Sequence, residues 1–191
     1  MAERAAPLAA LADRIAAAGF DGTSLAAVPF LAQVGLRVDP DGAAARRVEA
    51  ELGLALPTAN RVAEAGGRRA LWLGPDEWLV VAADGEERAL VALLEQAVAG
   101  DGAVVDLSAN RTGLTLAGPH ARDVLATCCS LDLHPRVFGP GQCAQTLLQK
   151  AGILLEQRDA DDYLLLVRPS FAAYVAEWLL DGMAGLSADA A

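Results

Sequence analysis

Three cysteines and two histidines are the residues of this 191-residue chain whose side chains could hold a metal or act as a nucleophile. Cys128 and Cys129 are adjacent, whereas tetrahedral zinc sites use ligand pairs about two to four residues apart. Adjacent side chains on a helix point about 100° apart and converge poorly. The pattern favours small buried thiols. The alternative is a zinc-binding or redox module that would also use Cys143.

The remaining candidates for chemistry are equally sparse. Cys128 and Cys129 are expected at the C-terminal end of a helix, where the helix dipole opposes a thiolate. No carboxylate lies at a regular offset from both His120 and His134, so we interpret these histidines as surface or capping residues. The chain has no phosphate-binding glycine loop and no nucleophile-elbow sequence. We therefore expect no catalytic, cofactor-binding or metal-binding residue in this chain.

The charge of the chain argues against nucleic acid and anionic membranes as partners. Asp and Glu total 25 against 15 Lys and Arg, which gives a formal net charge of −10. No basic cluster exceeds a pair such as Arg46–Arg47, and phosphate backbones and anionic lipids are bound by clustered cations. We find no apolar run near the roughly 18–20 residues of a membrane span, and no secretory signal pattern. With an odd number of cysteines, this predicts a cytoplasmic protein.

Hydrophobic periodicity and turn residues predict strands and helices in an order that repeats once. An N-terminal helix is predicted over residues 3–18, with a thin apolar face formed by Leu8, Leu11 and Ile15. In the first half we predict strands at 30–38, 68–73, 77–82 and 103–107, helices at 43–52 and 86–98, and a loop at 54–65. In the second half we predict strands at 112–116, 143–157 (or a hairpin bent at 151–152) and 163–167, and helices at 120–129 and 171–183.

Equal spacing of two strand–helix segments indicates an internal duplication. Trp78–Val81 and Tyr163–Leu166 are aromatic-led apolar strands 85 positions apart, and the helices that follow, from Glu86 and from Phe171, have the same offset. We therefore expect an α+β fold of two related ferredoxin-like halves, each in the order strand-helix-strand-strand-helix. The expected division is 1–28 (N-terminal helix and linker), 29–107 (first half), 108–185 (second half) and 186–191 (tail).

Large aromatic residues gather at two places in the predicted elements. Trp72 and Trp78 flank one predicted turn, and Tyr174 and Trp178 lie on the last predicted helix. Each is expected in a core, although aromatic side chains at a terminal helix also suit a partner surface.

Several sequence blocks carry a resemblance to a known family. The specific blocks are Gly-Pro-Asp-Glu-Trp, within residues 73–79, and Asn-Arg-Thr-Gly at residues 110–113. Further matching blocks lie at residues 29–33, 36–40, 118–125, 143–146 and 168–179. From about Pro29 to Met183, the chain resembles the gamma subunit of heterotetrameric sarcosine oxidase.

This resemblance implies a complex of alpha, beta, gamma and delta subunits that oxidatively demethylates sarcosine. The implied products are glycine, hydrogen peroxide and methylene-tetrahydrofolate, or formaldehyde when tetrahydrofolate is absent. The chain is then part of an oxidoreductase that acts on CH–NH donors with oxygen as acceptor. FAD, FMN, NAD, zinc and tetrahydrofolate are implied in the other subunits, and the gamma chain is implied to be a non-catalytic structural subunit.

A weaker resemblance links Asp106-Leu107-Ser108 and Gly118-Pro119 to the folate-binding fold of the glycine-cleavage aminomethyltransferases. The alternative function is therefore a free-standing folate-dependent one-carbon protein of that type. Those enzymes use a carboxylate after an asparagine to engage folate, whereas Asn60 and Asn110 are each followed by an arginine here. An arginine cannot accept a proton from the folate amine, so this departure favours the subunit interpretation.

A subunit of a larger complex must offer a partner surface. Two segments are candidates for that surface. The first is the apolar face of the N-terminal helix, formed by Leu8, Leu11 and Ile15, and the second is the turn at Asn110 and Arg111. Arg111 is the candidate polar anchor of the interface.

Overall fold

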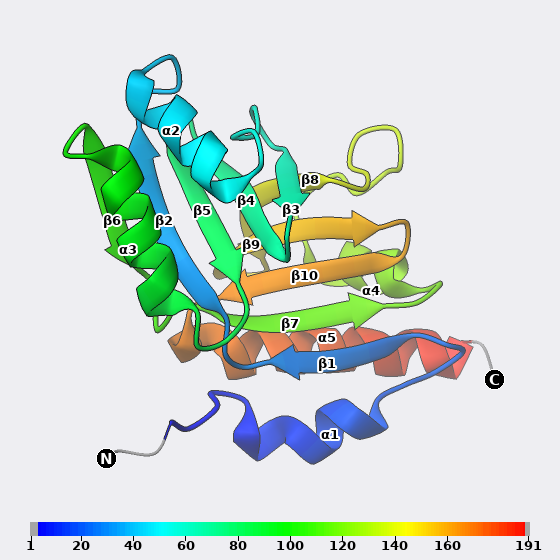
Figure 1. Ribbon diagram of the computed structural model, residues 1–191. Coiled ribbons are helices and arrows are strands. Elements are labelled where there is room, and N and C mark those ends of the chain that lie inside the picture. Colours follow the sequence, from blue (N-terminus) through cyan, green and yellow to red (C-terminus); the bar gives the residue numbers. More distant parts are fainter. Residues whose placement is uncertain (1–3, 190–191) are drawn as a thin grey trace. The chain divides into compact units, whose positions relative to one another are not determined.

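The computed structural model describes residues 4–189 and separates into two compact units (Figure 1). The continuous unit is Phe30–Asn110, and the discontinuous unit joins the segment up to Pro29 with the segment from Arg111 onward. The sequence instead suggests residues 29–107 and 108–185 as the halves, with residues 1–28 apart from both. In the structure the N-terminal segment belongs to the discontinuous unit, because its residues 24–28 form a strand that pairs in the sheet of that unit.

A five-stranded antiparallel sheet and two helices form the continuous unit. Its elements in chain order are β2 (Ala32–Val38), α2 (Ala43–Leu52), β3 (Val62–Ala65), β4 (Arg68–Gly74), β5 (Glu77–Ala82), α3 (Glu87–Val98) and β6 (Gly102–Asp106). The sheet order is β3-β4-β5-β2-β6. Helix α2 ends at Gly53, whose φ of 67° is the left-handed conformation that glycine adopts without steric cost.

The core of the continuous unit lies between its sheet and its two helices (Figure 1). Its apolar cluster joins strand residues such as Val80 to Val48 of α2 and Leu94 of α3. Trp78 in β5 is 3% exposed, and its Nε1 donates a hydrogen bond to the carbonyl of Pro57 at 2.9 Å. The prediction that Trp78 is a core residue is therefore confirmed.

The discontinuous unit has a second five-stranded antiparallel sheet. It begins with a 3₁₀ turn (Ala9–Leu11) and continues with α1 (Ala12–Ala17), β1 (Ser24–Val28), β7 (Thr112–Ala117), α4 (Ala121–Cys128), β8 (Gln142–Leu148), β9 (Ala151–Asp159), β10 (Asp162–Val167) and α5 (Pro169–Asp189). The sheet order is β1-β7-β10-β9-β8. Its core joins Leu114 and Leu165 of the sheet to Leu125 of α4 and Leu179 of α5.

The two sheets have the same arrangement of strands. The order β3-β4-β5-β2-β6 in one unit matches β8-β9-β10-β7-β1 in the other. β5 begins at Glu77 and β10 at Asp162, which is the 85-residue offset found in the sequence. Without the outer strands β3 and β8, both units have the ferredoxin-like strand arrangement that the sequence predicts. The continuous unit also has the ferredoxin-like connectivity, whereas the discontinuous unit is a circular permutation of it. The edge strand differs in origin, since β6 follows α3 along the chain and β1 comes from the N-terminal segment.

Two strands lie where the sequence predicts none. β3 falls within residues 54–65, which read as a loop, and β1 falls within the expected linker. β3 pairs with β4 through a tight turn at Gly66 and Gly67, both with positive φ. β1 pairs along its whole length with β7, from Ser24 opposite Ala117 to Val28 opposite Gly113. Both strands are short, and pairing holds them in place more than side-chain burial does.

The N-terminal helix is shorter than predicted and its apolar face is not exposed. Leu8 and Ile15 are 3% and 4% exposed and belong to the core of the discontinuous unit, and Leu11 packs against that core. Arg14 makes a two-pronged ion pair with Glu177 of α5, with an Nη2–Oε2 distance of 2.8 Å. This corrects the expectation that Leu8, Leu11 and Ile15 form a partner surface, because the segment uses them to pack within its own unit.

The C-terminal part of the chain also differs in detail from the prediction. Residues 143–157 are mostly divided between β8 and β9, and the turn lies at Gln149 and Lys150 rather than at residues 151–152. α5 extends to Asp189, so helix replaces most of the expected tail. Residues 190 and 191 of that tail lie outside the described residues.

Candidate functional site

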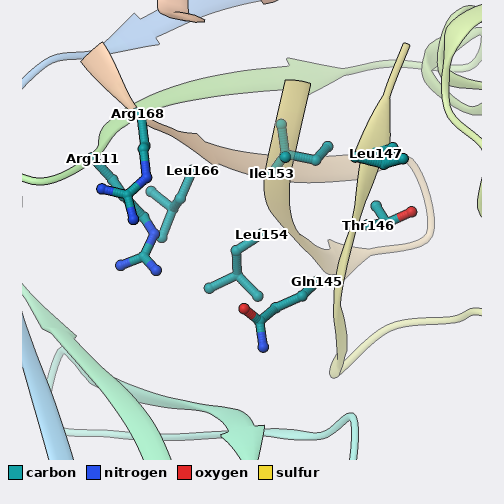
Figure 2. A pocket seen from close by; sticks show the side chains of 9 residues that line it. Arg111, Gln145, Thr146, Leu147, Ile153, Leu154, Leu166 and Arg168 are labelled. Atoms are coloured by element: carbon teal, nitrogen blue, oxygen red, sulfur yellow. The ribbon is translucent and has the colours of Figure 1, made fainter. Parts of the chain in front are cut away.

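A pocket of about 390 Å³ lies on the sheet of the discontinuous unit (Figure 2). Its walls are formed by Arg111, Gln145, Thr146, Leu147, Gly152, Ile153, Leu154, Leu166 and Arg168. In Figure 2 the two guanidinium groups lie at the left of the view, and Leu154 and Gln145 lie near its centre, with Gln145 below Leu154. The pocket thus combines two cations and one amide with apolar walls.

Strand pairing brings these polar side chains together. Arg111 immediately precedes β7 and Arg168 immediately follows β10, and the last ladder pair of these strands is Thr112 with Val167. The two arginines therefore leave neighbouring strands at the same end. Gln145 of β8 pairs with Leu154 of β9, which pairs in turn with Leu166 of β10, so these three residues form a row across the sheet.

The chemistry of the pocket is that of recognition. A guanidinium group presents a rigid fork of N–H donors that matches a carboxylate, and such charge-assisted hydrogen bonds are about twice as strong as neutral ones. Gln145 adds an amide, and Leu154 and Leu166 add apolar contact. The lining residues do not include a carboxylate, a histidine or a cysteine, so they supply no general base or thiolate. The pocket is suited to a carboxylate-bearing group with an apolar body.

Asn110 and Arg111, the predicted interface turn, are the residues at which the chain passes from the continuous unit into the discontinuous unit. The backbone N–H of Asn110 donates to the carbonyl of Leu107 at 2.8 Å, which closes the turn after β6. Arg111 lies in the pocket wall with its Nη1 atom buried. Arg111 could be chosen as a candidate from the sequence, whereas Arg168 and Gln145 could not, because only the strand register places these two residues beside Arg111.

The cysteines do not form a reactive site. Burial raises the pKa of the Cys128 thiol to about 11 and also raises the pKa of Cys129. Cys128 lies at the end of α4 and directs its Sγ toward the carbonyl of Val124, while Cys143 is buried in β8. Within residues 4–189, no group of three His, Cys, Asp or Glu side chains could hold a metal ion. Protonated thiols at neutral pH are poor ligands and poor nucleophiles.

The histidines have structural contacts. His120 stands at the N-terminal boundary of α4, stacks on Phe20 with ring centroids 5.3 Å apart, and has its backbone N–H bonded to Thr23 Oγ1 at 3.0 Å. Nδ1 of His134 accepts a hydrogen bond from the backbone N–H of Arg136 at 3.2 Å. His120 therefore helps to join the N-terminal segment to α4, and His134 shapes its own loop.

Comparison with known proteins places this chain in a family. The model of the sarcosine oxidase gamma subunit family matches residues 35–185, and this chain belongs to that family. The sarcosine oxidase subunit gamma of Corynebacterium sp. (strain U-96) is 40% identical over 187 residues, which cover 96% of this chain and 90% of that protein. The family resemblance seen in the sequence blocks is thereby confirmed.

Solved structures agree with this assignment. A chain of the heterotetrameric sarcosine oxidase from Corynebacterium sp. U-96, solved in complex with pyrrole 2-carboxylate, superposes with a TM-score of 0.90 and 38% identity, covering 96% of both chains. The glycine cleavage system aminomethyltransferase T from Bartonella henselae superposes with a TM-score of 0.69 at 20% identity, covering 91% of this chain and 56% of that one. The second match shows that the predicted aminomethyltransferase-like fold is correct.

Proposed function

We propose that this chain is a non-catalytic structural subunit, the gamma subunit, of a heterotetrameric sarcosine oxidase. The observation that carries this proposal is the superposition on a chain of such a heterotetramer over 96% of both chains. The coverage supports the same role for this chain, because the match extends over both units instead of one shared half. The two arginines, the amide and the apolar walls of the pocket support a recognition role within the complex.

The partners in this proposal are the alpha, beta and delta subunits. Together they convert sarcosine to glycine, hydrogen peroxide and methylene-tetrahydrofolate or formaldehyde, with FAD, FMN, NAD, zinc and tetrahydrofolate held by the other subunits. The donor set of this chain supports that division, since the raised pKa values of Cys128 and Cys129 disfavour the thiolates that bind zinc, and Asn60 and Asn110 are followed by arginines. The proposed compartment is the cytoplasm. Among residues 4–189, no helix is both long enough and apolar enough to cross a membrane.

Arg111 is the proposed polar anchor for a partner subunit, with Asn110 beside it in the turn. A half-buried guanidinium next to Arg168 would bind a carboxylate of the partner through a two-pronged hydrogen bond, and little water would compete with it. A reversed charge at that position would place two like charges together and leave the partner's carboxylate without its donor.

Co-expression tests the assembly. The four subunits are produced together with an affinity tag on the alpha chain, and the purified material is analysed for subunit ratio and sarcosine-dependent hydrogen peroxide formation. We expect this chain to be retained in equal amount with alpha, and its omission to lower the yield or stability of the complex. A complex that forms with equal yield and stability without this chain would contradict the proposed structural role.

Arg111 is tested in the same system. Arg111→Glu should lower the amount of this chain retained by alpha at least tenfold, and Arg111→Lys should give an intermediate loss because lysine keeps the charge without the fork. Arg136→Glu, at an exposed loop position, is the matched control and should be retained like the wild type. Thermal unfolding of each isolated variant separates lost binding from lost folding. Wild-type retention of a folded Arg111→Glu variant would remove Arg111 from the interface.

A further inference from the structure

Helix α5 presents a row of aromatic side chains to solvent. Phe171 and Trp178 are 44% and 36% exposed, and Tyr174 between them is half-buried. The three residues follow the spacing of one helix face, and their rings meet edge to face with centroids 6.4 Å and 6.3 Å apart. Two of the five large apolar side chains exposed in the described structure are therefore neighbours on this helix face.

Hollows lie on both sides of Trp178. One of about 350 Å³ is lined by Tyr174, Glu177, Trp178 and Asp181. The other, of about 290 Å³, is lined by Thr127, Trp178, Asp181, Gly182, Gly185 and Leu186. Because Trp178 and Asp181 border both hollows, the two form one grooved surface along α5, which we call the α5 groove.

Two glycines of α5, Gly182 and Gly185, line the second hollow. Packing within the chain requires a glycine at position 182 but not at position 185. A Cβ on Gly182 would lie 2.8 Å from Thr127 Oγ1, so glycine permits the contact between α4 and α5. A Cβ on Gly185 would meet no atom within 4 Å, although glycine weakens a helix interior relative to alanine. Because residue 185 has no side chain, the surface there has room for a bulky side chain of another protein chain.

The rim of the groove is acidic. The carboxylate of Glu177 is held by Arg14, and that hydrogen bond lowers the pKa of Glu177. Asp181 borders both hollows, and across residues 4–189 it makes no ion pair or hydrogen bond. A cation brought to this rim would therefore find a carboxylate that the chain itself leaves exposed.

We propose that the α5 groove is a docking site for an amphipathic segment of another subunit of the complex, with an apolar side chain packed on Trp178 and a lysine or arginine directed to Asp181. This inference rests on the proposed function and specifies one surface that performs it. A second copy of this chain is a poor occupant, because a two-fold interface would bring the acidic rims together in a chain of net charge −10.

The test measures binding of the purified chain to an assembly of the other three subunits. Gly185→Gln would fill the hollow with a good helix former, so its thermal midpoint should stay equal to that of the wild type or rise, while its Kd should rise at least tenfold. Asp181→Lys should likewise raise the Kd at least tenfold, and more so at low salt, because it reverses the charge that faces the partner's cation.

Two control variants distinguish an effect on the α5 groove from the effect of adding a side chain or changing a charge elsewhere on the surface. Ala184→Gln adds the same side chain one position away on α5, where it does not border either hollow, and Glu51→Lys makes the same type of charge change on α2. Both should bind like the wild type.

The outcomes distinguish this proposal from the proposed function. If the wild type fails to bind, the proposed function fails. If the wild type binds and Gly185→Gln and Asp181→Lys bind equally well, the α5 groove is not the docking site. An isolated chain that sediments as a dimer, and that Gly185→Gln converts to a monomer, would show that a second copy occupies the groove and would also overturn the proposal.

Discussion

Trp78 shows how one side chain can satisfy both packing and polarity in the core. Its ring is almost completely buried in the continuous unit, and its indole N–H has an acceptor in the Pro57 carbonyl. Truncation would leave a large cavity and an unpaired carbonyl, and large-to-small changes of this kind cost about 3–5 kcal/mol.

We therefore expect Trp78→Ala to lower the free energy of unfolding by about 3–5 kcal/mol, measured by urea denaturation. Trp178→Ala is the comparison, because a side chain that is 36% exposed loses less on truncation. A loss below about 1 kcal/mol for Trp78→Ala would contradict the buried role of this residue.

The buried thiol of Cys128 should make the free energy of unfolding depend on pH in the alkaline range. Burial raises the pKa of its thiol from 9.0 to about 11, so the folded state keeps the proton at a pH where the unfolded state has lost it. Stability is unaffected below pH 9 and falls as the pH rises from 9 to 11, by at most about 3 kcal/mol. Cys128→Ala should reduce this fall in denaturation curves between those pH values. An identical pH dependence in the wild type and the variant would show that Cys128 does not cause it.

The residue-scale predictions from sequence succeed where local chemistry is sufficient. Trp78 follows a turn in a strongly apolar strand, so its burial could be predicted. The prediction of buried thiols is confirmed for Cys128 and Cys143, whereas Cys129 is half-buried. Arg168 and Gln145 could not be identified as partners of Arg111, because their proximity depends on the register of β7, β10 and β8.

At the scale of elements, the N-terminal segment is fixed to the discontinuous unit by close backbone contacts. Gly118, between β7 and α4, has a φ of 116°, and a Cβ there would lie 2.3 Å from the Gly22 carbonyl oxygen and 2.5 Å from Thr23 Cα. The turn before β1 can approach only because residue 118 has no side chain. Gly53, at the end of α2, also has a positive φ, but a Cβ there would meet nothing within 4 Å.

This contrast predicts different costs for the same substitution. Gly53→Ala should lower the free energy of unfolding by about 1–2 kcal/mol, which is the cost of a left-handed conformation for an L-residue. Gly118→Ala should cost distinctly more, because backbone overlap adds to the conformational cost, and it should increase hydrogen exchange at β1. Equal losses for the two variants, or unchanged exchange at β1, would show that Gly118 does not fix the N-terminal segment.

Element prediction succeeds for strands and helices that carry their own apolar pattern. β5 and β10 are continuous apolar runs and α3 has a clear apolar face, so each is close to its predicted range. β1 buries only Leu25, and β3 has no buried residue, so periodicity gives no signal for either strand. Hydrogen bonding to β7 and to β4 stabilises them, and that pairing is set by tertiary structure.

At the scale of the whole molecule, the two units share one spatial order of strands but differ in where their edge strand comes from. The continuous unit completes its sheet with β6, whereas the discontinuous unit completes its sheet with β1, from the other end of the chain. The family membership and the match to a chain of heterotetrameric sarcosine oxidase extend over both units. The fold class could be predicted from the repeat at 85 residues, but the origin of the edge strand could not.

Native mass spectrometry of the four co-expressed subunits tests the central claim most directly. The proposal predicts an assembly whose mass contains one copy of this chain with one copy each of alpha, beta and delta, and whose dissociation in the gas phase releases this chain. Detection of this chain only by itself, or only in assemblies of its own copies, while the other three subunits associate without it, would contradict the claim.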